Sequence, residues 1–227
     1  MERIGAVVLA AGSGKRMGAD IPKQYLALCG KPVMVYCLEA FEKSRVDEIV
    51  LVVAPGDRAY CRKEIVEKYH ITKVSAIVDG GAERYDSVYQ GLLACTDTDY
   101  VFIHDGARPF VTQQMISECF ELAKKGHPSI VAVPVKDTMK RVVNGVVVET
   151  PNRDEMYSVQ TPQAAPTELL KKAHEAAKKT HFLGTDEASL IEKYTDIPVC
   201  VVKGAYTNIK LTTPEDLLMA EQLLVAE

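Results

Sequence analysis

Short apolar runs alternate along the chain with longer segments in which apolar residues recur every three or four positions. The short runs are rich in valine and isoleucine and predict strands at 4–10, 49–54, 74–79, 100–104, 130–135 and 199–203. The longer segments predict helices near 32–43, 57–69, 84–94, 112–125, 166–179, 186–193 and 214–225. This alternation is typical of an α/β fold whose mostly parallel sheet carries helices on both faces.

Three polar or glycine-rich segments directly follow predicted strands, at 10–23, 79–87 and 104–109. Right-handed crossovers bring the carboxyl ends of parallel strands to the same edge of a sheet. We therefore expect the three segments to meet in one crevice.

The first of these segments has the composition of an anion-binding loop. Gly12 and Gly14 let phosphate oxygens approach backbone N–H groups closely, and Lys15, Arg16 and Lys23 add positive charge. The spacing matches neither G-x-x-x-x-G-K-[ST] nor G-x-G-x-x-G, which disfavours a P-loop kinase or a dinucleotide dehydrogenase. Taken alone, the loop indicates either a nucleotide site or an ordinary strand-to-helix turn.

One stretch, 139–150, departs from the alternation of strands and helices. Asn144-Gly145 lies between valine-rich runs, which predicts a hairpin with a type I′ turn. Because an isolated two-stranded hairpin is marginal in water, we expect it to protrude as an arm and pack against a second subunit. The alternative is a hairpin that folds back on its own domain.

Composition narrows the class of protein. The chain has 227 residues, 47% hydrophobic and 26% charged, which suits one globular domain over 1–227. A net charge of −4 argues against general binding to nucleic acid or to an anionic membrane. Six dispersed cysteines without a C-x-x-C pair, and no signal-peptide or membrane-spanning run, lead us to expect a soluble protein of the reducing cytoplasm.

Several motifs, in the same order along the chain, resemble those of sugar-phosphate and polyol-phosphate cytidylyltransferases. The glycine segment reads A-A-G-x-G-x-R-M and is followed by P-K-Q-Y. Further agreement occurs at 79–81, 84, 86–88, 104–109, 137–141, 160–163, 185–188 and 208–210. The chain is most similar to the 2-C-methyl-D-erythritol 4-phosphate cytidylyltransferase family of the non-mevalonate isoprenoid pathway. The resemblance implies a Rossmann-like, nucleotide-diphospho-sugar-transferase-like fold, and a homodimer built around the arm at 137–160.

The implied reaction joins CTP to 2-C-methyl-D-erythritol 4-phosphate and releases pyrophosphate. Because two anions must meet, positioning and charge neutralisation by cations and Mg²⁺ should dominate, without a covalent nucleophile. By resemblance, Arg16 and Lys23 are the catalytic residues that contact the triphosphate. The expected nucleotide-binding residues are Ala10, Ala11, Gly12, Ser13, Gly14, Lys15, Gly80, Gly81, Arg84, Ser87, Asp105 and Gly106.

The acceptor site is expected to combine hydroxyls for polyol oxygens with cations for the phosphate. Its expected residues are Asp105, Arg108, Thr138, Arg153, Thr161, Thr185 and Lys210, with Thr138 and Arg153 completing the neighbouring subunit's site if the arm crosses over. The sequence shows no cluster of metal ligands, so Asp105 acting through water is the candidate contact to Mg²⁺. His104 is interpreted as structural, because the attacking phosphate is already anionic near neutral pH.

Two other functions remain open on the sequence. A ribitol 5-phosphate cytidylyltransferase would share the fold and the CTP chemistry, but those enzymes tend toward L-A-G-G and H-D-S-V-R-P where this chain has Leu9-Ala10-Ala11-Gly12 and H-D-G-A-R-P at 104–109. A non-catalytic nucleotide-binding module is the second alternative, because a fold alone does not establish activity. The presence of both Arg16 and Lys23 argues against it.

Overall fold

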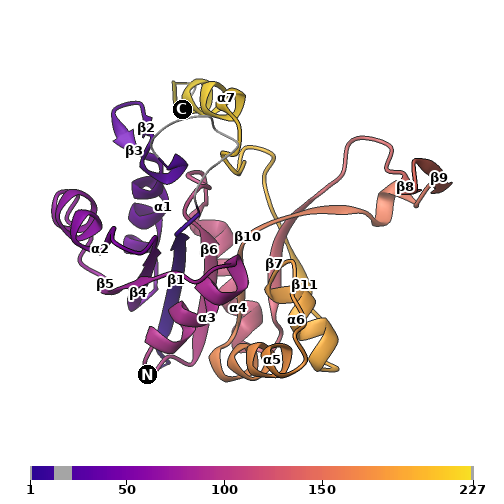
Figure 1. Ribbon diagram of the computed structural model, residues 1–227, viewed down its shortest axis with the longest axis horizontal. Helices are drawn as coiled ribbons and strands as arrows, with labels where there is room; N and C mark the ends of the chain where they lie inside the picture. The colour runs from indigo at the N-terminus through magenta and orange to yellow at the C-terminus, as the bar shows by residue number, and fades with distance from the viewer. Residues whose placement is uncertain (1, 13–21, 226–227) are drawn as a thin grey trace.

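The computed structural model describes residues 2–12 and 22–225. Its centre is a seven-stranded sheet in the order β11-β7-β10-β6-β1-β4-β5 (Figure 1). The strands of this sheet are β1 (Ile4–Ala10), β4 (Glu48–Val53), β5 (Val74–Asp79), β6 (Tyr100–Asp105), β7 (Ser129–Pro134), β10 (Tyr157–Pro166) and β11 (Cys200–Lys203). Two short pairs lie outside it, β2 (Ala27–Leu28) with β3 (Lys31–Pro32) and β8 (Arg141–Val143) with β9 (Val146–Glu149).

The helices alternate with these strands along the chain. They are α1 (Val33–Glu42), α2 (Arg58–Tyr60), α3 (Arg84–Ala94), α4 (Gln113–Lys124), α5 (Thr167–Lys179), α6 (Glu187–Tyr194) and α7 (Pro214–Val225). Two short 3₁₀ turns lie between strands, η2 (Lys23–Tyr25) before β2 and η4 (Arg153–Glu155) before β10. The expected helix at 57–69 is divided into α2 and the π-helix η3 (Cys61–Glu67).

The central parallel strands are buried on both faces, because the helices that connect them cover each side of the sheet. β1 pairs in parallel with β4 and β6, and every residue of β4 is buried. Side chains alternate between two cores: Ala6 and Val8 face the layer of α1 and α4, whereas Val7 faces the layer of α3, α5 and α6. The predicted α/β class with helices on both faces is confirmed.

The strand β10 was absent from the predicted elements, and it changes the topology. It lies antiparallel between β6 and β7, with Ala164 opposite Phe102 on one side and Ser129 on the other. β10 therefore carries its own residues, Thr161 and Gln163 among them, into the middle of the sheet.

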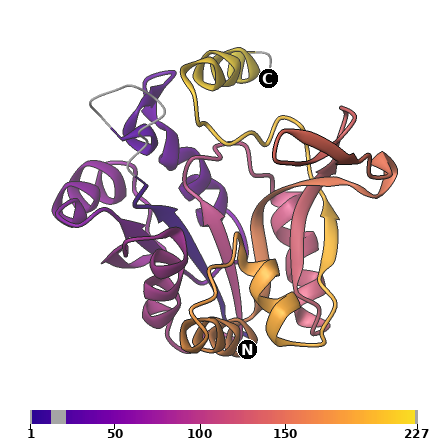
Figure 2. The same ribbon diagram turned by 45° about the vertical axis from the view of Figure 1, so that its right-hand side comes forward.

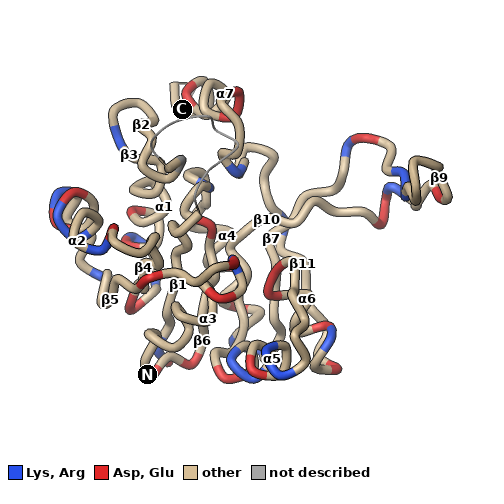
Figure 3. Tube along the Cα trace, in the orientation of Figure 1, with Lys and Arg blue, Asp and Glu red and all other residues tan. Residues whose placement is uncertain are grey.

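The hairpin β8–β9 extends away from the body as an arm (Figures 1 and 2). Asn144 and Gly145 have φ values of 51° and 79°, which confirms the predicted turn with two residues in the left-handed region. Every residue of both strands is exposed. Basic and acidic residues are interspersed along the arm and the body in Figure 3. Within the described ranges, no helix combines the length and apolarity needed to cross a bilayer.

Candidate active site

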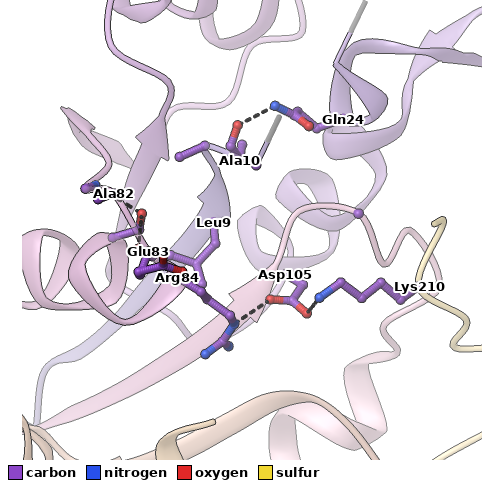
Figure 4. Close-up of a pocket in the computed structure, with 13 residues that line it drawn as sticks. Leu9, Ala10, Gln24, Ala82, Glu83, Arg84, Asp105 and Lys210 are labelled. Carbon is purple, nitrogen blue, oxygen red and sulfur yellow. Dashed lines mark hydrogen bonds and ion pairs between the residues drawn. The ribbon is translucent and has the colours of Figure 1, made fainter. Parts of the chain in front are cut away.

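A cavity of about 360 Å³ opens at the carboxyl edge of β1 and β6, beside the start of α3 (Figure 4). Its lining residues are Leu9, Ala10, Ala11, Gly12, Gln24, Gly81, Ala82, Glu83, Arg84, Ser87, Asp105, Ala107 and Lys210. All three segments that follow predicted strands contribute to this lining, together with Leu9, Gln24 and Lys210. The expected crevice is therefore present.

Two glycines allow the loops of this cavity to approach one another. A Cβ on Gly80 would lie 2.5 Å from the Cβ of Ala11, and a Cβ on Gly106 would lie 2.9 Å from the carbonyl oxygen of Leu9. The N–H of Gly106 instead donates to that same oxygen at 2.8 Å. Glycine at these positions brings the three loops together around one space.

Ser87 lies on the first turn of α3 with its hydroxyl already engaged. Its oxygen accepts a hydrogen bond from the N–H of Gly81 at 3.1 Å and donates to the carbonyl of Glu83 at 3.1 Å. Glu83 also opens the helix through a capping box with Asp86. Ser87 is only 5% exposed. Its hydroxyl oxygen has one lone pair left, which can accept a hydrogen bond from a further donor.

A row of ion pairs forms the wall of the cavity in Figure 4. The Nε of Arg84 lies 3.3 Å from Oδ1 of Asp105, and the Nζ of Lys210 lies 2.7 Å from Oδ2. Behind Arg84, the carboxylate of Glu187 accepts from Nη1 at 2.8 Å and from Nη2 at 3.0 Å. Burial alone would raise the pKa of Asp105, but the charges of Arg84 and Lys210 hold it well below its usual value.

A second cavity, of about 280 Å³, lies on the other side of this wall. It is lined by Arg84, Asp105, Arg108, Val159, Gln160, Thr161, Gln163, Thr185, Asp186 and Lys210. Arg84, Asp105 and Lys210 belong to both cavities. The expected acceptor residues Arg108, Thr161, Thr185 and Lys210 thus gather in one space, separate from the glycine loops.

His104 supports this wall from within the sheet. Its ring is fully buried, with Nδ1 3.1 Å from the hydroxyl of Thr161 and Nε2 3.1 Å from the carbonyl of Arg108. Burial lowers the pKa of His104 to about 4. Thr161 in turn accepts from the N–H of Asp105 at 3.0 Å. Among the described residues His104 lies outside both linings, so its contacts are structural.

Other predicted residues lie elsewhere. Ser13, Gly14, Lys15 and Arg16 lie outside the described residues, as does the side chain of Lys23, whose backbone opens η2. Thr138 and Arg153 are exposed near the base of the arm and, in this chain, lie outside both linings. Arg153 donates to the carbonyl of Lys136 at 3.4 Å.

Sequence reasoning overlooked two residues that shape the site. Gln24 is 2% exposed and donates to the carbonyl of Ala10 at 2.6 Å, which ties η2 to the end of β1. Glu187 holds Arg84 from behind the wall. Both fall within motifs that carried the resemblance, at 22–25 and 185–188, and that membership was the available signal.

The side chains of the site could bind a magnesium ion only together with substrate phosphates. No group of three or more His, Cys, Asp or Glu side chains in the described ranges is arranged to hold a metal. Asp105 has one cation at each carboxylate oxygen and keeps a lone pair on each. Mg²⁺ commonly takes one or two carboxylates, several waters and substrate phosphates, so Asp105 fits a contact through water.

A mostly parallel sheet with a glycine-lined cavity and a cation-lined cavity at its carboxyl edge is typical of an α/β enzyme that binds nucleotides. The family model described as 2-C-methyl-D-erythritol 4-phosphate cytidylyltransferase matches residues 4–226. The chain belongs to this family. The finding favours the methylerythritol phosphate enzymes over the ribitol phosphate alternative.

Individual relatives agree with the family model. The enzyme of that name from Bacillus thuringiensis (strain Al Hakam) is 48% identical over 219 residues, which cover 96% of each chain. The one from Alkaliphilus metalliredigens (strain QYMF) is 46% identical over 98% of this chain and 93% of its own. The crystal structure of 4-diphosphocytidyl-2C-methyl-D-erythritol synthase from Anaerococcus prevotii DSM 20548 superposes with a TM-score of 0.87 at 34% identity, covering 99% of this chain and 96% of that one.

Proposed function

We propose that the two cavities transfer CMP from CTP to 2-C-methyl-D-erythritol 4-phosphate. The acceptor phosphate attacks the α-phosphorus in line, and pyrophosphate leaves. The observation that carries this assignment is the wall of Arg84, Asp105 and Lys210, which faces both cavities. The two anionic substrates bind in adjacent cavities and come together at the residues that the cavities share, where Arg84 and Lys210 supply positive charge. Positioning and electrostatic neutralisation therefore supply the catalysis.

The glycine-lined cavity receives the nucleotide. The hydroxyl of Ser87 already donates its proton to Glu83 and therefore acts as an acceptor toward a ligand. Cytosine offers an amino group where uracil offers a carbonyl, so an acceptor at this position favours CTP over UTP. Gly80 and Gly81 let this side of the cavity pack closely, because a side chain on either would collide with Ala11, Ser87 or Asp86.

Arg16 and Lys23 are proposed to contact the triphosphate and to stabilise the charge of the leaving pyrophosphate. Gly12 and Gln24, which flank them in the sequence, both line the nucleotide cavity. Asp105 would hold Mg²⁺ through a water, and the metal would supply neutralisation of the triphosphate charge. The phosphate of the acceptor lies beside Arg108 and Lys210. The hydroxyl groups of the acceptor form hydrogen bonds with Thr161 and Thr185.

Residues 1–227 are proposed to form one nucleotidyltransferase domain whose arm, 137–160, joins two copies into a homodimer. Val142, Val146 and Val147 are 53%, 64% and 54% exposed, and a two-stranded hairpin with apolar exposed faces needs a partner surface. Thr138 and Arg153 then reach the acceptor cavity of the other subunit.

Complementation between two impaired variants tests this arrangement, assayed at an acceptor concentration well below the KM of Arg153→Ala, where that variant has little activity. Lys23→Ala removes a residue of a subunit's own site, whereas Arg153→Ala removes one that is proposed to serve the partner's site. Mixed dimers contain one intact site, so unfolding and refolding the two variants together should restore about a quarter of wild-type activity. A dimer that regains no activity after mixing would contradict a shared site.

The reaction itself is tested by pyrophosphate release from CTP with 2-C-methyl-D-erythritol 4-phosphate, with ribitol 5-phosphate, or without an acceptor. We expect release with the first substrate and at most traces with the others. Preference for ribitol 5-phosphate would overturn the substrate assignment, and tight CTP binding without release would indicate a non-catalytic module. Activity that survives chelation would remove Mg²⁺ from the scheme.

A further inference from the structure

Glu187 is a buried carboxylate that none of the roles above uses. It is the first residue of α6, 3% exposed, and among the described residues it lies outside both linings. Its two oxygens accept from the two terminal nitrogens of Arg84 at 2.8 and 3.0 Å. This two-pronged contact fixes the plane of the guanidinium as well as its position.

The orientation of Arg84 determines what faces Asp105. Nη1 and Nη2 each use one N–H on Glu187, and it is Nε that faces Asp105, 3.3 Å from Oδ1. The other oxygen, Oδ2, is left to Lys210 at 2.7 Å. Four charges of alternating sign, Glu187, Arg84, Asp105 and Lys210, thus run from behind the wall into both cavities.

The residues on both sides of Glu187 are held in place by contacts that do not involve Arg84. The side chain of Gln163 on β10 donates to Asp186 at 2.9 Å and accepts from the N–H of Ala188 at 3.1 Å. Asp186 caps α6 by accepting from the N–H of Ser189 at 3.0 Å. The beginning of α6 is therefore anchored to the sheet on both sides of Glu187.

We propose, building on the proposed function, that Glu187 is a positioning residue: it holds Arg84 in the orientation that divides the carboxylate of Asp105 between Arg84 and Lys210. Without the charge of Glu187, the terminal nitrogens of Arg84 turn to Asp105, their nearest remaining counter-ion, and displace Lys210. Lys210 then loses the position from which it binds the acceptor phosphate. The contacts of Ser87 and the glycine loops to the nucleotide are unaffected.

The electrostatics of Arg84 agree with this role. Burial disfavours the charged form of its guanidinium, yet the carboxylates of Glu187 and Asp105 raise the pKa of Arg84 above its ordinary value. Arg84 has a side chain that is 31% exposed, and a partly buried cation with two carboxylate partners turns toward one when the other is neutralised, because leaving its charge unpaired is costly.

The test is a comparison of Michaelis constants in Glu187→Gln, Glu187→Asp and Ser189→Ala. Glu187→Gln keeps the shape and removes the charge, and we expect the KM for the acceptor to rise about tenfold to hundredfold. Because Arg84 also lines the nucleotide cavity, the KM for CTP should rise as well, but by a several-fold smaller factor. Glu187→Asp keeps the charge but is one methylene shorter, so its acceptor KM should lie between those of Glu187→Gln and the wild type. Ser189→Ala loosens the start of α6 without touching the charge row, and its Michaelis constants should match the wild type.

Two outcomes would overturn the proposal. One is a Glu187→Gln enzyme with wild-type Michaelis constants. The other is equal change in Glu187→Gln and Ser189→Ala, because a merely structural role would affect both. If Glu187→Gln does not fold, Glu187→Asp decides the matter by its acceptor KM, and a wild-type value counts against the proposal. A wild-type enzyme that releases no pyrophosphate would instead refute the proposed function, so the two failures are distinguishable.

Discussion

Replacing His174 by phenylalanine should make the protein less sensitive to acid. The ring of His174 on α5 is fully buried and stacks on two tyrosines of α3, with centroids 4.8 Å from Tyr85 and 6.0 Å from Tyr89. Neither ring nitrogen finds a hydrogen-bond partner in the described part of the chain. Burial, with a smaller effect from the charge of Arg84, lowers the pKa of His174 to about 4 from an ordinary value of 6.5.

The sign and size of the effect follow from proton linkage. The unfolded chain protonates this imidazole below about pH 6.5 and the folded chain only below about pH 4, so acid favours unfolding throughout that window. Above about pH 6.5 the free energy of unfolding is not reduced by protonation of His174. By pH 5 this protonation lowers the free energy of unfolding by about 2 kcal/mol. His104, whose pKa is also lowered to about 4, contributes a similar loss. The lowered pKa of Asp105 affects the free energy of unfolding only below the ordinary value of 3.8, so Asp105 does not contribute between pH 7.5 and 5.

The assay is urea unfolding followed by far-ultraviolet circular dichroism at pH 7.5, 6 and 5, at one fixed protein concentration. The two histidines should cost the wild type about 4 kcal/mol between pH 7.5 and 5, and His174→Phe should lose about 2 kcal/mol less. At pH 7.5 the variant should lie within about 1 kcal/mol of the wild type, because a ring of similar shape replaces one that makes no hydrogen bond. Equal acid sensitivity in both proteins would refute the reasoning.

Three further predictions concern the site. Lys23→Ala should reduce kcat about a hundredfold with an unchanged circular dichroism spectrum, because a cation on the triphosphate is lost; turnover near the wild-type value would contradict the assignment. Ser87→Ala should lower the ratio of kcat/KM for CTP over UTP about tenfold, and an unchanged ratio would place base recognition elsewhere. Arg153→Ala should raise the KM for the acceptor much more than that for CTP, and equal effects would argue against its contact with the acceptor phosphate.

Local pattern predicted the parallel part of the fold closely, because there the apolar period and the tertiary environment agree. The observed bounds of β1, α3 and α7 coincide with the expected ranges 4–10, 84–94 and 214–225. β10 was missed because its sequence, Y-S-V-Q-T-P-Q-A-A-P, has neither a β-branched run nor regular alternation. It is a strand because β6 and β7 pair with it from both sides, and only the assembled sheet supplies those partners.

The site shows the same division between local and long-range information. The loops that form the nucleotide cavity were predictable, since each follows a recognisable strand and strand ends share an edge. The pairing of Glu187 with Arg84 joins residues 103 apart in the sequence. An acidic residue in the first turn of a helix is favoured by the helix dipole alone, so its presence there does not reveal a distant partner.

The alternating charges also explain how a crevice for two anions remains ordered before either arrives. Lys210 has a side chain only 36% exposed, and a lysine without a counter-ion there would sample many rotamers. Asp105, at 2.7 Å, holds the ammonium at the boundary of both cavities. Because the lysine is already ordered, binding a phosphate requires less loss of side-chain entropy than ordering a free lysine would. The wall therefore has a carboxylate at its centre, although both of its substrates are anions.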